Sequence, residues 1–400
     1  MARKTVTDIE VAGKRALIRV DFNVPIENGK ITDDRRIRAA IPTIRSVIDR
    51  GGRAILVSHL GRPKGEGYEA EYTLKPVAEK LAQILGSPVG FPSSDCVDDA
   101  ARQAVEQMAD GDIILLENLR FHKGETKGDA EFGRKLAAQA DLYINDAFGT
   151  AHRPHASMVA APRAMEGKPR VAGLLLEAEL KYLSDALAEP RAPFIIVIGG
   201  AKVSTKLAAI EHLLPKADRL IVGGAMAYTF LKAAGGAVGA SRVEEDMLDA
   251  ARRAMRAAEQ AGKTLLLPVD HVCAAEFSET APPRDIEGDI PAGLMGLDIG
   301  AKSRRACAEA IAGAGTVVWN GPMGVFEWEN FAAGTRAVGE SIARATDAGG
   351  TTVVGGGDTA AAAEKFGLAD RMSHISTGGG AALEMLEGKS FEAVELLDRA

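Results

Sequence analysis

This 400-residue sequence has few cysteines and no long apolar or basic runs. Its three cysteines, Cys96, Cys273 and Cys307, are far apart and form no CxxC pair, so neither a disulfide framework nor a zinc site is indicated. The net charge of −7 and the lack of a Lys/Arg-rich run argue against nucleic-acid binding. The start has no signal-peptide core, and the longest apolar runs are strand-sized. We therefore expect a cytoplasmic protein without a nucleic-acid or membrane partner.

Two familiar nucleotide-binding motifs are missing as well. The sequence has no GxxxxGK[ST] loop, and it has no GxGxxG segment followed by an acidic partner. It therefore supports neither a Walker-type NTPase nor a Rossmann dehydrogenase. Because the overall charge is negative, any anionic ligand has to be held by a local basic cluster.

What the sequence does contain is the alternation of an α/β protein. At 46% hydrophobic and 26% charged residues the composition is that of a globular protein, and the length predicts two domains of similar size. Short β-branched runs alternate with amphipathic helical patterns, which predicts parallel sheets covered by helices on both faces. We expect two lobes, each with a mostly parallel sheet in a Rossmann-like three-layer arrangement, joined by a helix hinge.

The expected elements are spread evenly along the chain. The predicted strands are Ala16–Val20, Ala54–Ser58, Ile113–Leu116, Leu142–Asn145, Ile195–Ile198, Leu220–Val222, Thr264–Leu267, Val317–Trp319, Thr352–Val354 and His374–Ser376. The predicted helices include Ile37–Arg50, Leu74–Leu85, Val97–Met108, Glu131–Ala140, Ser204–Leu214, Glu244–Gln260, Ala332–Ala345 and a last stretch at Phe391–Ala400. We place an N-terminal lobe at 1–172, an interdomain helix at 173–187 and a C-terminal lobe at 188–387.

The stretch Thr351–Phe366, TTVVGGGDTAAAAEKF, is the most informative segment. An apolar strand runs into three glycines and then into an alanine-rich helix, an order that directs backbone N–H groups and a helix dipole at an anion. Asp358 follows the glycines. A carboxylate beside a phosphate is repulsive unless a cation lies between them, so Asp358 is interpreted as a Mg²⁺ ligand. The alternative is that Asp358 is an ordinary helix N-cap.

Open parallel sheets bind ligands beyond the carboxyl ends of their strands, and in the first half these ends are followed by charged loops. Arginines grip carboxylate and phosphate oxygens in pairs, and Asp/Asn side chains accept bonds from hydroxyl groups, so a small, polyanionic, hydroxylated ligand is predicted. The alternative is that each arginine is an ordinary ion-paired residue and that the histidines are structural. The loop residues are Asp21, Asn23, His59, Arg62, Arg120, His152 and Arg153, and Arg36 joins them from the start of the next helix.

The corresponding loops of the second half are rich in glycine and mostly uncharged, which favours a nucleotide site. Lys202 follows a strand and two glycines and is the candidate cation for a transferred group; the alternative is a solvated lysine at a helix start. Glu327 is a candidate acceptor for the ribose hydroxyls, although a plain surface acid is the better explanation of this residue taken by itself.

Eight segments resemble, in order and spacing, the motifs of phosphoglycerate kinases: RVDFNVP, SHLGRP, ENLRF, DAFGTAHR, GGAKVSTK, WNGPMGVFEW, GGGDTAA and STGGGA. The resemblance covers essentially the whole chain. It implies reversible phosphoryl transfer from 1,3-bisphosphoglycerate to MgADP, giving 3-phosphoglycerate and MgATP, in glycolysis and gluconeogenesis. It also implies a monomer whose tail, 388–400, packs back on the first lobe.

The resemblance assigns roles to individual residues. It implies that the triose acid is bound by Asp21, Asn23, Arg36, His59, Arg62, Arg120 and Arg153. It implies that the nucleotide, ATP or ADP, is bound by Lys202, Lys206, Gly223, Gly224, Gly296, Asn320, Glu327, Gly356, Gly357, Asp358 and Thr359, with Mg²⁺ on Asp358. One departure is Thr205, which stands where the family often has Asp.

The chemistry of this reaction agrees with what the sequence lacks. The group that attacks or leaves is a carboxylate, which carries no proton at neutral pH, so no general base is needed. Catalysis then rests on positioning and on neutralising the charge of the moving group, and we assign Arg36, Lys202 and the amides near Gly357 to that task. Competing hypotheses are a carboxylate kinase with another acceptor and a non-catalytic nucleotide or phosphosugar sensor.

Overall fold

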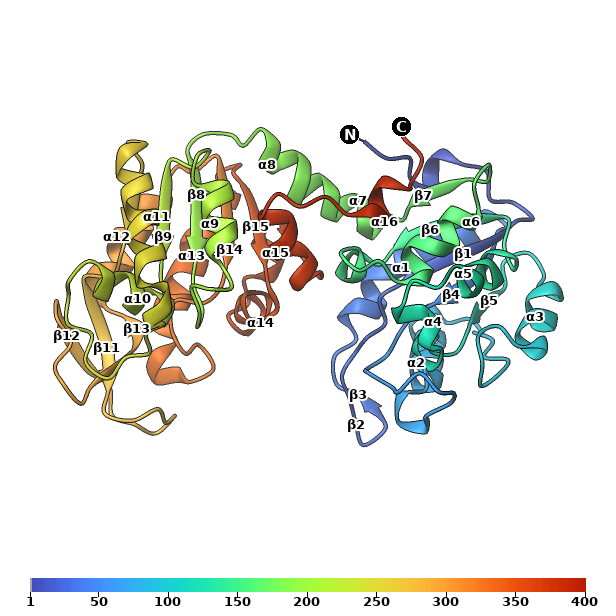
Figure 1. The fold of residues 1–400 in the computed structure, drawn as a ribbon, viewed down its shortest axis with the longest axis horizontal. Coiled ribbons are helices and arrows are strands. Elements are labelled where there is room, and N and C mark those ends of the chain that lie inside the picture. Colours follow the sequence, from blue (N-terminus) through green and yellow to red (C-terminus); the bar gives the residue numbers. More distant parts are fainter. Residues whose placement is uncertain (1) are drawn as a thin grey trace. The chain divides into compact units, whose positions relative to one another are not determined.

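A computed structural model of the chain describes residues 2–400, except for the side chains of 185 and 186. The chain forms two compact units (Figure 1). We call Met1–Leu180 together with Ser390–Ala400 the N-terminal unit, and Lys181–Lys389 the C-terminal unit. Among the described helices, none has both the length and the apolar character that a membrane crossing needs.

The N-terminal unit is built on a five-stranded parallel sheet with the order β5-β4-β1-β6-β7. Its inner strands are buried along nearly their whole length, which requires cover on both faces because successive side chains point to opposite sides. The strands are β1 (Arg15–Val20), β4 (Arg53–Val57), β5 (Ile113–Leu115), β6 (Leu142–Asp146) and β7 (Arg170–Ala172), beside a small hairpin of β2 (Ile26–Glu27) and β3 (Lys30–Ile31).

Amphipathic helices provide that cover. In α1 (Arg35–Ile48), for example, Ile37, Ile44 and Val47 are buried at helical spacing. The other helices of this unit are α2 (Lys75–Leu85), α3 (Asp99–Glu106), α4 (Lys123–Thr126), α5 (Ala130–Ala137), α6 (Ala161–Ala164), α7 (Leu174–Leu180) and α16 (Glu392–Glu395). Short turns complete the unit: η1 (Val6–Asp8), η2 (Ala70–Tyr72), η3 (Leu119–Phe121), η4 (Phe148–Thr150) and η5 (Ala156–Ala160).

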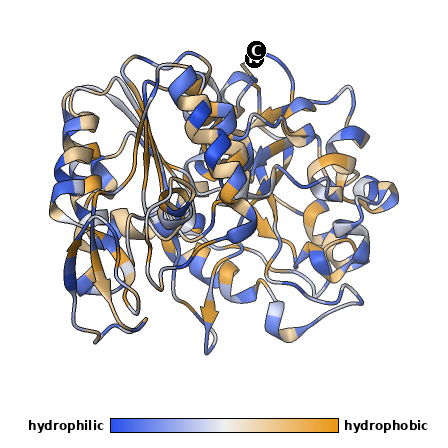
Figure 2. Cartoon of the chain, turned by 60° about the vertical axis from the view of Figure 1, so that its left-hand side comes forward, coloured by the Kyte–Doolittle hydropathy of each residue, from blue (hydrophilic) through white to orange (hydrophobic). Residues whose placement is uncertain are grey.

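The C-terminal unit has a six-stranded parallel sheet, in the order β10-β9-β8-β14-β15-β16, and a separate three-stranded antiparallel sheet, β12-β11-β13. Its core contains the fully buried Trp319, and the apolar strands are visible in Figure 2 between helices of mixed polarity. The strands are β8 (Phe194–Ile198), β9 (Arg219–Val222), β10 (Thr264–Leu266), β11 (Asp270–Ala274), β12 (Arg284–Glu287), β13 (Met295–Ile299), β14 (Thr316–Asn320), β15 (Thr351–Gly355) and β16 (His374–Ile375).

Most helices of the C-terminal unit lie between these strands in the chain, whereas α8 precedes the first strand and α15 follows the last. The helices are α8 (Ala186–Ala188), α9 (Leu207–Leu213), α10 (Met226–Ala233), α11 (Leu248–Gln260), α12 (Ala301–Ile311), α13 (Ala333–Asp347), α14 (Gly357–Lys365) and α15 (Gly380–Leu386). The shorter turns are η6 (Lys181–Asp185), η7 (Glu245–Met247), η8 (Glu329–Phe331) and η9 (Ala369–Arg371).

The α/β fold class is confirmed, since both main sheets are parallel and each predicted strand matches an observed one to within about a residue at each end. The antiparallel sheet was not predicted. Its strands, such as β12 with the sequence RDIE, are short and carry charged, exposed side chains, so they lack the continuous apolar run of a buried parallel strand. The helices α10 and α12 were also missed, because glycine-rich flanks and a high charge content obscured their periodicity.

Four helix predictions were wrong in their bounds by three residues or more. The helix expected over Glu131–Ala140 ends at Ala137, and the one expected over Glu244–Gln260 begins at Leu248. The helix expected from Ser204 begins at Leu207, because the residues before it form a loop. The helix expected over Phe391–Ala400 is limited to α16, and the residues after it run back along the first residues of the chain. There the N–H of Lys4 donates to the carbonyl of Asp398 at 2.9 Å, and Arg3 forms an antiparallel bridge with Arg399.

The chain passes from one unit to the other through α7, η6 and α8. A buried carboxylate fixes the start of α7: Oδ1 of Asp146 accepts the N–H groups of Leu175 at 2.9 Å and Leu176 at 3.2 Å. Burial raises the pKa of Asp146 to about 7. Gly173 packs so closely on this carboxylate that any side chain there would collide with it. The direction of α7 is therefore set by groups within the N-terminal unit.

Candidate active site

The charged loops of the N-terminal unit gather at one edge of its sheet. The strands β1, β4, β5 and β6 are parallel, so the loops that follow them emerge at the same edge. Hydrogen bonds connect these loops: the N–H of Gly61 donates to Oδ1 of Asn23 at 2.9 Å, and Nη1 of Arg120 donates to the carbonyl of Gly61 at 2.6 Å. The loops after β1, β4 and β5 therefore form one connected group.

Arg36 enters this group from the first turn of α1. Its Nη1 lies 3.2 Å from Oδ2 of Asp21 and donates to the carbonyl of Asn23 at 3.0 Å. The Arg36 side chain is still 33% exposed, whereas that of Asp21 is 9% exposed. The guanidinium is thus held in place on one side and open to a ligand on the other.

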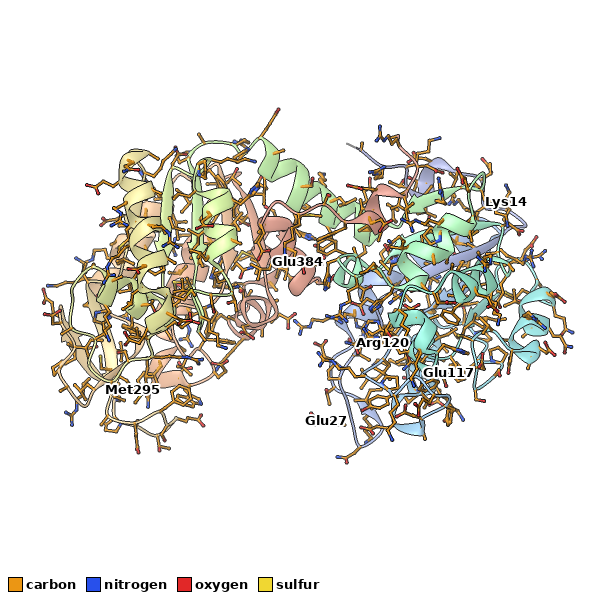
Figure 3. The ribbon with its side chains drawn as sticks, viewed as in Figure 1. Lys14, Glu27, Glu117, Arg120, Met295 and Glu384 are labelled. Carbon is orange, nitrogen blue, oxygen red and sulfur yellow. The ribbon has the colours of Figure 1, made fainter. Side chains whose placement is uncertain are left out.

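The positive charges of this edge act on one another. The pKa of Arg120 is lowered to about 10, first by burial and then by Arg153 and Arg19. Arg120 therefore stays protonated at neutral pH, although like charges surround it. Its neighbour Glu117, labelled beside it in Figure 3, caps the start of α2 by accepting the N–H of Leu74 at 2.8 Å. A polyanionic ligand would relieve this repulsion.

A buried network beneath these loops was not predicted from the sequence. Arg19 is fully buried in β1, and its Nε donates to Oγ of Ser157 at 2.9 Å while its Nη2 lies 3.2 Å from Nδ1 of His59. The fully buried Glu125 accepts both the N–H of Ser157, at 2.9 Å, and its hydroxyl, at 2.6 Å. Nδ1 of His155 lies 3.8 Å from Oε1 of Glu125. The feature of the sequence that could have indicated this network is Arg19, a charged residue inside the apolar strand RALIRV.

Both histidines of this network are neutral at neutral pH. The pKa of His59 is held well below 6.5, by burial first and then by Arg19, Arg120 and Arg153. Burial, followed by the same arginines, lowers the pKa of His155 to about 4. A neutral His59 can accept a hydrogen bond from Arg19 at Nδ1 and present its Nε2–H to a ligand.

The remaining predicted residues of this half are less firmly held. Arg153 is half-buried, and its Nε lies 3.2 Å from Nε2 of His152. Arg62 is exposed in the loop after β4, and within residues 2–400 its side chain makes no hydrogen bond or ion pair. Arg153 belongs to the same electrostatic group as His59 and Arg120, while nothing fixes the guanidinium of Arg62.

The C-terminal unit contains a cavity of about 470 Å³ at the corresponding edge of its own sheet. Four of the predicted nucleotide-binding residues line it: Gly224, Gly296, Glu327 and Asp358. Glu327 is exposed at its border. The residues that prediction missed supply most of its apolar and aromatic surface, and Met295 among them is labelled in Figure 3. The missed lining residues are Gly200, Ala201, Ala225, Tyr228, Ala240, Arg242, Phe277, Met295, Leu297, Pro322, Gly324 and Val325.

The glycines of this cavity are required by close packing. A side chain at Gly296 would collide with the hydroxyl end of Tyr228, and one at Gly224 would collide with the backbone of Gly200. Phe277 is 64% exposed, and its ring centroid lies 4.5 Å from that of Trp328. An exposed aromatic face beside glycine backbone provides a surface on which a flat base can stack.

The other predicted residues of this half lie outside the cavity wall. Nζ of Lys206 donates to Oδ1 of Asn320, whose Nδ2 is buried without a hydrogen-bond partner. Burial lowers the pKa of Lys206, and Asp358 opposes that shift. Oγ1 of Thr359 accepts the N–H of Gly321 at 2.7 Å. The other predicted nucleotide-binding residues that do not line the cavity are Lys202, Gly223, Gly356 and Gly357.

The structure bears on the alternative interpretations of Lys202 and Asp358. Lys202 is exposed on the loop before α9 and is not part of a helix start. The N-cap of α14 is Gly356, with φ of +89°, which glycine adopts without strain. Asp358 lies inside the first turn, so the N-cap interpretation is wrong. Within residues 2–400 its exposed carboxylate makes no hydrogen bond or ion pair.

The loop that carries Lys202 is held by a contact that sequence reasoning did not find. Oγ of Ser204 donates to Oε1 of Glu244 at 2.6 Å, and the N–H of Ser204 donates to Oε2 at 3.1 Å. The N–H of Glu244 in turn donates to Oγ1 of Thr229 in α10 at 3.1 Å. Thr205, the departure from the family pattern, only bonds back to the carbonyl of Lys202, at 3.0 Å.

Two parallel-sheet units, one with a cluster of arginines and the other with a glycine-lined cavity and a helix start bearing a free carboxylate, define a phosphotransferase. Comparison with known proteins makes this specific. The family model for phosphoglycerate kinase matches residues 6–389, and the chain belongs to the phosphoglycerate kinase family. It is thus a glycolytic kinase that uses ATP or ADP and has a carboxyl group as acceptor, which confirms the predicted activity.

Relatives match over the full length. The phosphoglycerate kinase of Rhodopirellula baltica is 52% identical over 404 residues, covering 100% of both chains. The structure of phosphoglycerate kinase from Coxiella burnetii is 41% identical, with a TM-score of 0.89 over 98% of each chain. That of the Pyrococcus horikoshii phosphoglycerate kinase is 32% identical, with a TM-score of 0.83 over 98% of each chain.

Proposed function

We propose that this protein catalyses reversible, Mg²⁺-dependent transfer of a phosphoryl group between 1,3-bisphosphoglycerate with ADP and 3-phosphoglycerate with ATP. The observation that carries the proposal is the arginine cluster of the N-terminal unit, in which Arg36 is fixed by Asp21 and Arg120 is crowded by like charges. Such a cluster suits a ligand that carries both a carboxylate and a phosphate.

In the N-terminal unit we assign the triose acid to the loop edge described above. Arg36, Arg62, Arg120 and Arg153 bind its anionic groups, because guanidinium forks match carboxylate and phosphate oxygens. Asp21 and Asn23 accept its hydroxyl hydrogen, and the neutral His59 donates from Nε2. We expect the buried Arg19–Ser157–Glu125 network to hold these loops in their positions.

In the C-terminal unit we assign the base and ribose of the nucleotide to the cavity. Gly224 and Gly296 leave room for the base, and Glu327 accepts from the ribose hydroxyls. Lys206, Gly223, Asn320, Gly356 and Thr359 are assigned to the phosphate end, where Nδ2 of Asn320 is a buried donor without a partner. Backbone N–H groups at the start of α14 suit the phosphate oxygens.

Asp358 fits Mg²⁺. This ion takes oxygen ligands, keeps several waters, and needs only one or two carboxylates besides the phosphates of its nucleotide. The exposed carboxylate of Asp358, with no hydrogen bond or ion pair among the described residues, is available for that role. When bound, Mg²⁺ supplies charge neutralisation at the phosphate oxygens.

The protein's own part in the reaction is positioning and charge compensation. A carboxylate of the triose acid attacks the terminal phosphate of ATP in line, and ADP leaves without a proton transfer that needs a base. Arg36 and Lys202 neutralise the moving phosphoryl group, together with the N–H groups near Gly357. The neutral, buried state of His59 and His155 agrees with a mechanism that has no general base.

Transfer requires the two reacting oxygens to approach the phosphorus, at about 3–3.5 Å before reaction. We propose that the two units, assigned above to different substrates, close by bending near 173–187 when both substrates are bound. Small-angle scattering with 3-phosphoglycerate and a non-hydrolysable MgATP analogue tests this. The radius of gyration should fall with both ligands, but not with either alone.

The experiment that tests the function itself is a coupled assay with 3-phosphoglycerate and MgATP. Turnover that depends on both substrates and on Mg²⁺ supports the proposal. Nucleotide binding without turnover would favour a sensor, and turnover with a different carboxylate would favour another carboxylate kinase. We propose that the enzyme acts in the cytoplasm as a monomer, because one chain supplies both groups of residues; size-exclusion chromatography with light scattering tests the latter.

A further inference from the structure

Asp95, Cys96 and His122 form a cluster in the N-terminal unit that has no part in the proposed reaction. One donor atom from each residue lies within 4.8 Å of the donor atoms of the other two. Asp95 and Cys96 are on the loop that leads to α3, whereas His122 lies between η3 and α4. A carboxylate, a thiol and an imidazole from two separate loops are brought together at one point.

The histidine and the carboxylate are in direct contact. Nε2 of His122 lies 3.0 Å from Oδ2 of Asp95. The other oxygen of Asp95 is occupied, since Oδ1 accepts the N–H of Val97 at 2.7 Å. The His122 ring is stacked on Phe132 with 4.9 Å between centroids, which fixes its plane. One oxygen of Asp95 and one nitrogen of His122 thus engage each other, and a metal ion bound between them would take the place of this contact.

The thiol lies deeper than its two partners. Cys96 is 1% exposed, and its carbonyl accepts from Nε2 of Gln139 at 3.2 Å. Gln139 is 4% exposed, and its Oε1 is buried with no hydrogen-bond partner. A metal ion at this point would compensate the charge of a buried thiolate, and the imidazole and the carboxylate lie near enough to share it.

We propose that Asp95, Cys96 and His122 bind one Zn²⁺. Zinc takes thiolate sulfur at about 2.3 Å and nitrogen or oxygen at about 2.0–2.2 Å, so tetrahedral ligand atoms lie about 3.3–3.8 Å apart. The Asp95–His122 separation of 3.0 Å is close to that spacing, and the sulfur has to move by about 1.5 Å at most from the outer limit of 4.8 Å.

The site has an entrance and room for a fourth ligand. His122 also lines an open cavity of about 590 Å³, together with Gly67, Lys123 and Phe132. A water molecule from this cavity completes the coordination, as in zinc sites that have three protein ligands. The ion would join the 91–98 loop to the start of α4, and so tie together two segments that are far apart in the chain. Sequence spacing gave no indication of this site, because its ligands come from two loops with no CxxC pattern.

Cobalt titration of the metal-free, full-length protein tests the proposal. Co²⁺ should produce a thiolate-to-metal charge-transfer band in the near ultraviolet that saturates at one equivalent, and Zn²⁺ should abolish it by displacement. Cys96→Ala should lose the band. Cys273→Ala and Cys307→Ala are matched controls, because both also remove a buried free thiol, and they should keep it. Binding at Asp358, an oxygen ligand, gives no such band.

Two further variants keep the test decisive if Cys96→Ala fails to fold. Asp95→Asn and His122→Gln should each weaken Co²⁺ binding by about tenfold or more while circular dichroism stays unchanged. Zn²⁺ should raise the melting temperature of the unmodified protein and of the two control variants, but not that of Asp95→Asn. No charge-transfer band in the native protein, a band that survives Cys96→Ala, or an equal thermal shift in Asp95→Asn would each overturn the proposal.

Discussion

In the N-terminal unit Arg19 is fully buried and Arg36 is bonded to Asp21, whereas in the C-terminal unit Lys202 is exposed on a loop. The first unit presents side-chain charges fixed by a network beneath them. The second presents glycine backbone around a cavity, with few charges near it. The difference indicates that the first site is organised before its ligand arrives, while the second depends on its ligand to order the cation.

This contrast has an energetic side. A charge fixed in advance costs no reorganisation during the reaction, but the network that fixes it has to be stabilised by folding. Substitutions in the network of the N-terminal unit should therefore affect the free energy of unfolding as well as activity. Substitutions of exposed groups in the C-terminal unit should affect activity alone.

The largest expected effect is on turnover, from loss of a charge at the transferred group. Arg36→Ala and Lys202→Ala should each lower kcat by about a hundredfold to a thousandfold, the cost of about 3–4 kcal/mol that follows loss of one well-placed donor. The coupled assay measures kcat and KM, and circular dichroism checks the fold. Arg38→Ala is the control, since Arg38 lies on the same helix but pairs with Asp34 at 2.9 Å. A loss below about threefold would remove either residue from the mechanism.

The next largest effect is on stability and is specific to the N-terminal unit. Glu125→Gln removes a fully buried charge that accepts both bonds from Ser157, so it should lower the free energy of unfolding by about 3 kcal/mol. Urea unfolding measures this. Glu131→Gln is the control, because Glu131 is exposed and paired with Lys135, and it should change stability by less than about 0.5 kcal/mol. Equal effects of the two variants would show that the buried network does not stabilise the unit.

A smaller effect concerns pH. The pKa of His155 is lowered from 6.5 to about 4 in the folded chain, so the unfolded chain binds more protons between these values. Stability from this group is therefore present above about pH 6.5 and is lost as the pH falls toward about 4. Urea unfolding measures the free energy of unfolding at pH 5 and at pH 7. The difference between these two free energies should be about 1–2 kcal/mol smaller in His155→Gln than in the wild type, because solvent near the ring screens part of the charge effect.

The control for the pH prediction lies in the other unit. His212 in α9 is an exposed histidine, so His212→Gln should leave the pH dependence of unfolding unchanged. If both variants flatten the dependence equally, or neither does, burial of His155 among arginines is not its cause.

The smallest expected effect tests the loop of the C-terminal unit. Glu244→Gln weakens the two bonds from Ser204 that hold the Lys202 loop, and should lower kcat by about threefold to tenfold with little change in KM for 3-phosphoglycerate. Glu245→Gln is the control, since Glu245 pairs with Lys232 instead. Loss of stability without loss of kcat would show that Glu244 supports the fold and does not position Lys202.

Sequence reasoning was strongest where a pattern is local. Buried parallel strands such as β8 are continuous apolar runs, and the residues after them can be read directly from the sequence. It was weakest where a role depends on distant partners. Nothing beside Glu125 in the chain indicates that it accepts from Ser157, and Phe277 can only be placed at the cavity once the antiparallel sheet is known. The sequence showed that Thr205 stands where the family often has Asp. It did not show that the neighbouring Ser204 contacts Glu244, which lies 40 residues further along the chain.

The segment Ser390–Ala400 belongs to the N-terminal unit, although the whole C-terminal unit precedes it in the chain. The C-terminal unit is thus inserted as one continuous segment into the sequence of the N-terminal unit. The ribosome synthesises all of it before it reaches Ser390–Ala400, the last segment of the N-terminal unit. The N–H groups of Lys4 and Arg170 donate to Asp398, so neither bond can form until the C-terminal unit has been synthesised. The C-terminal unit can therefore fold before the N-terminal unit has received its last segment.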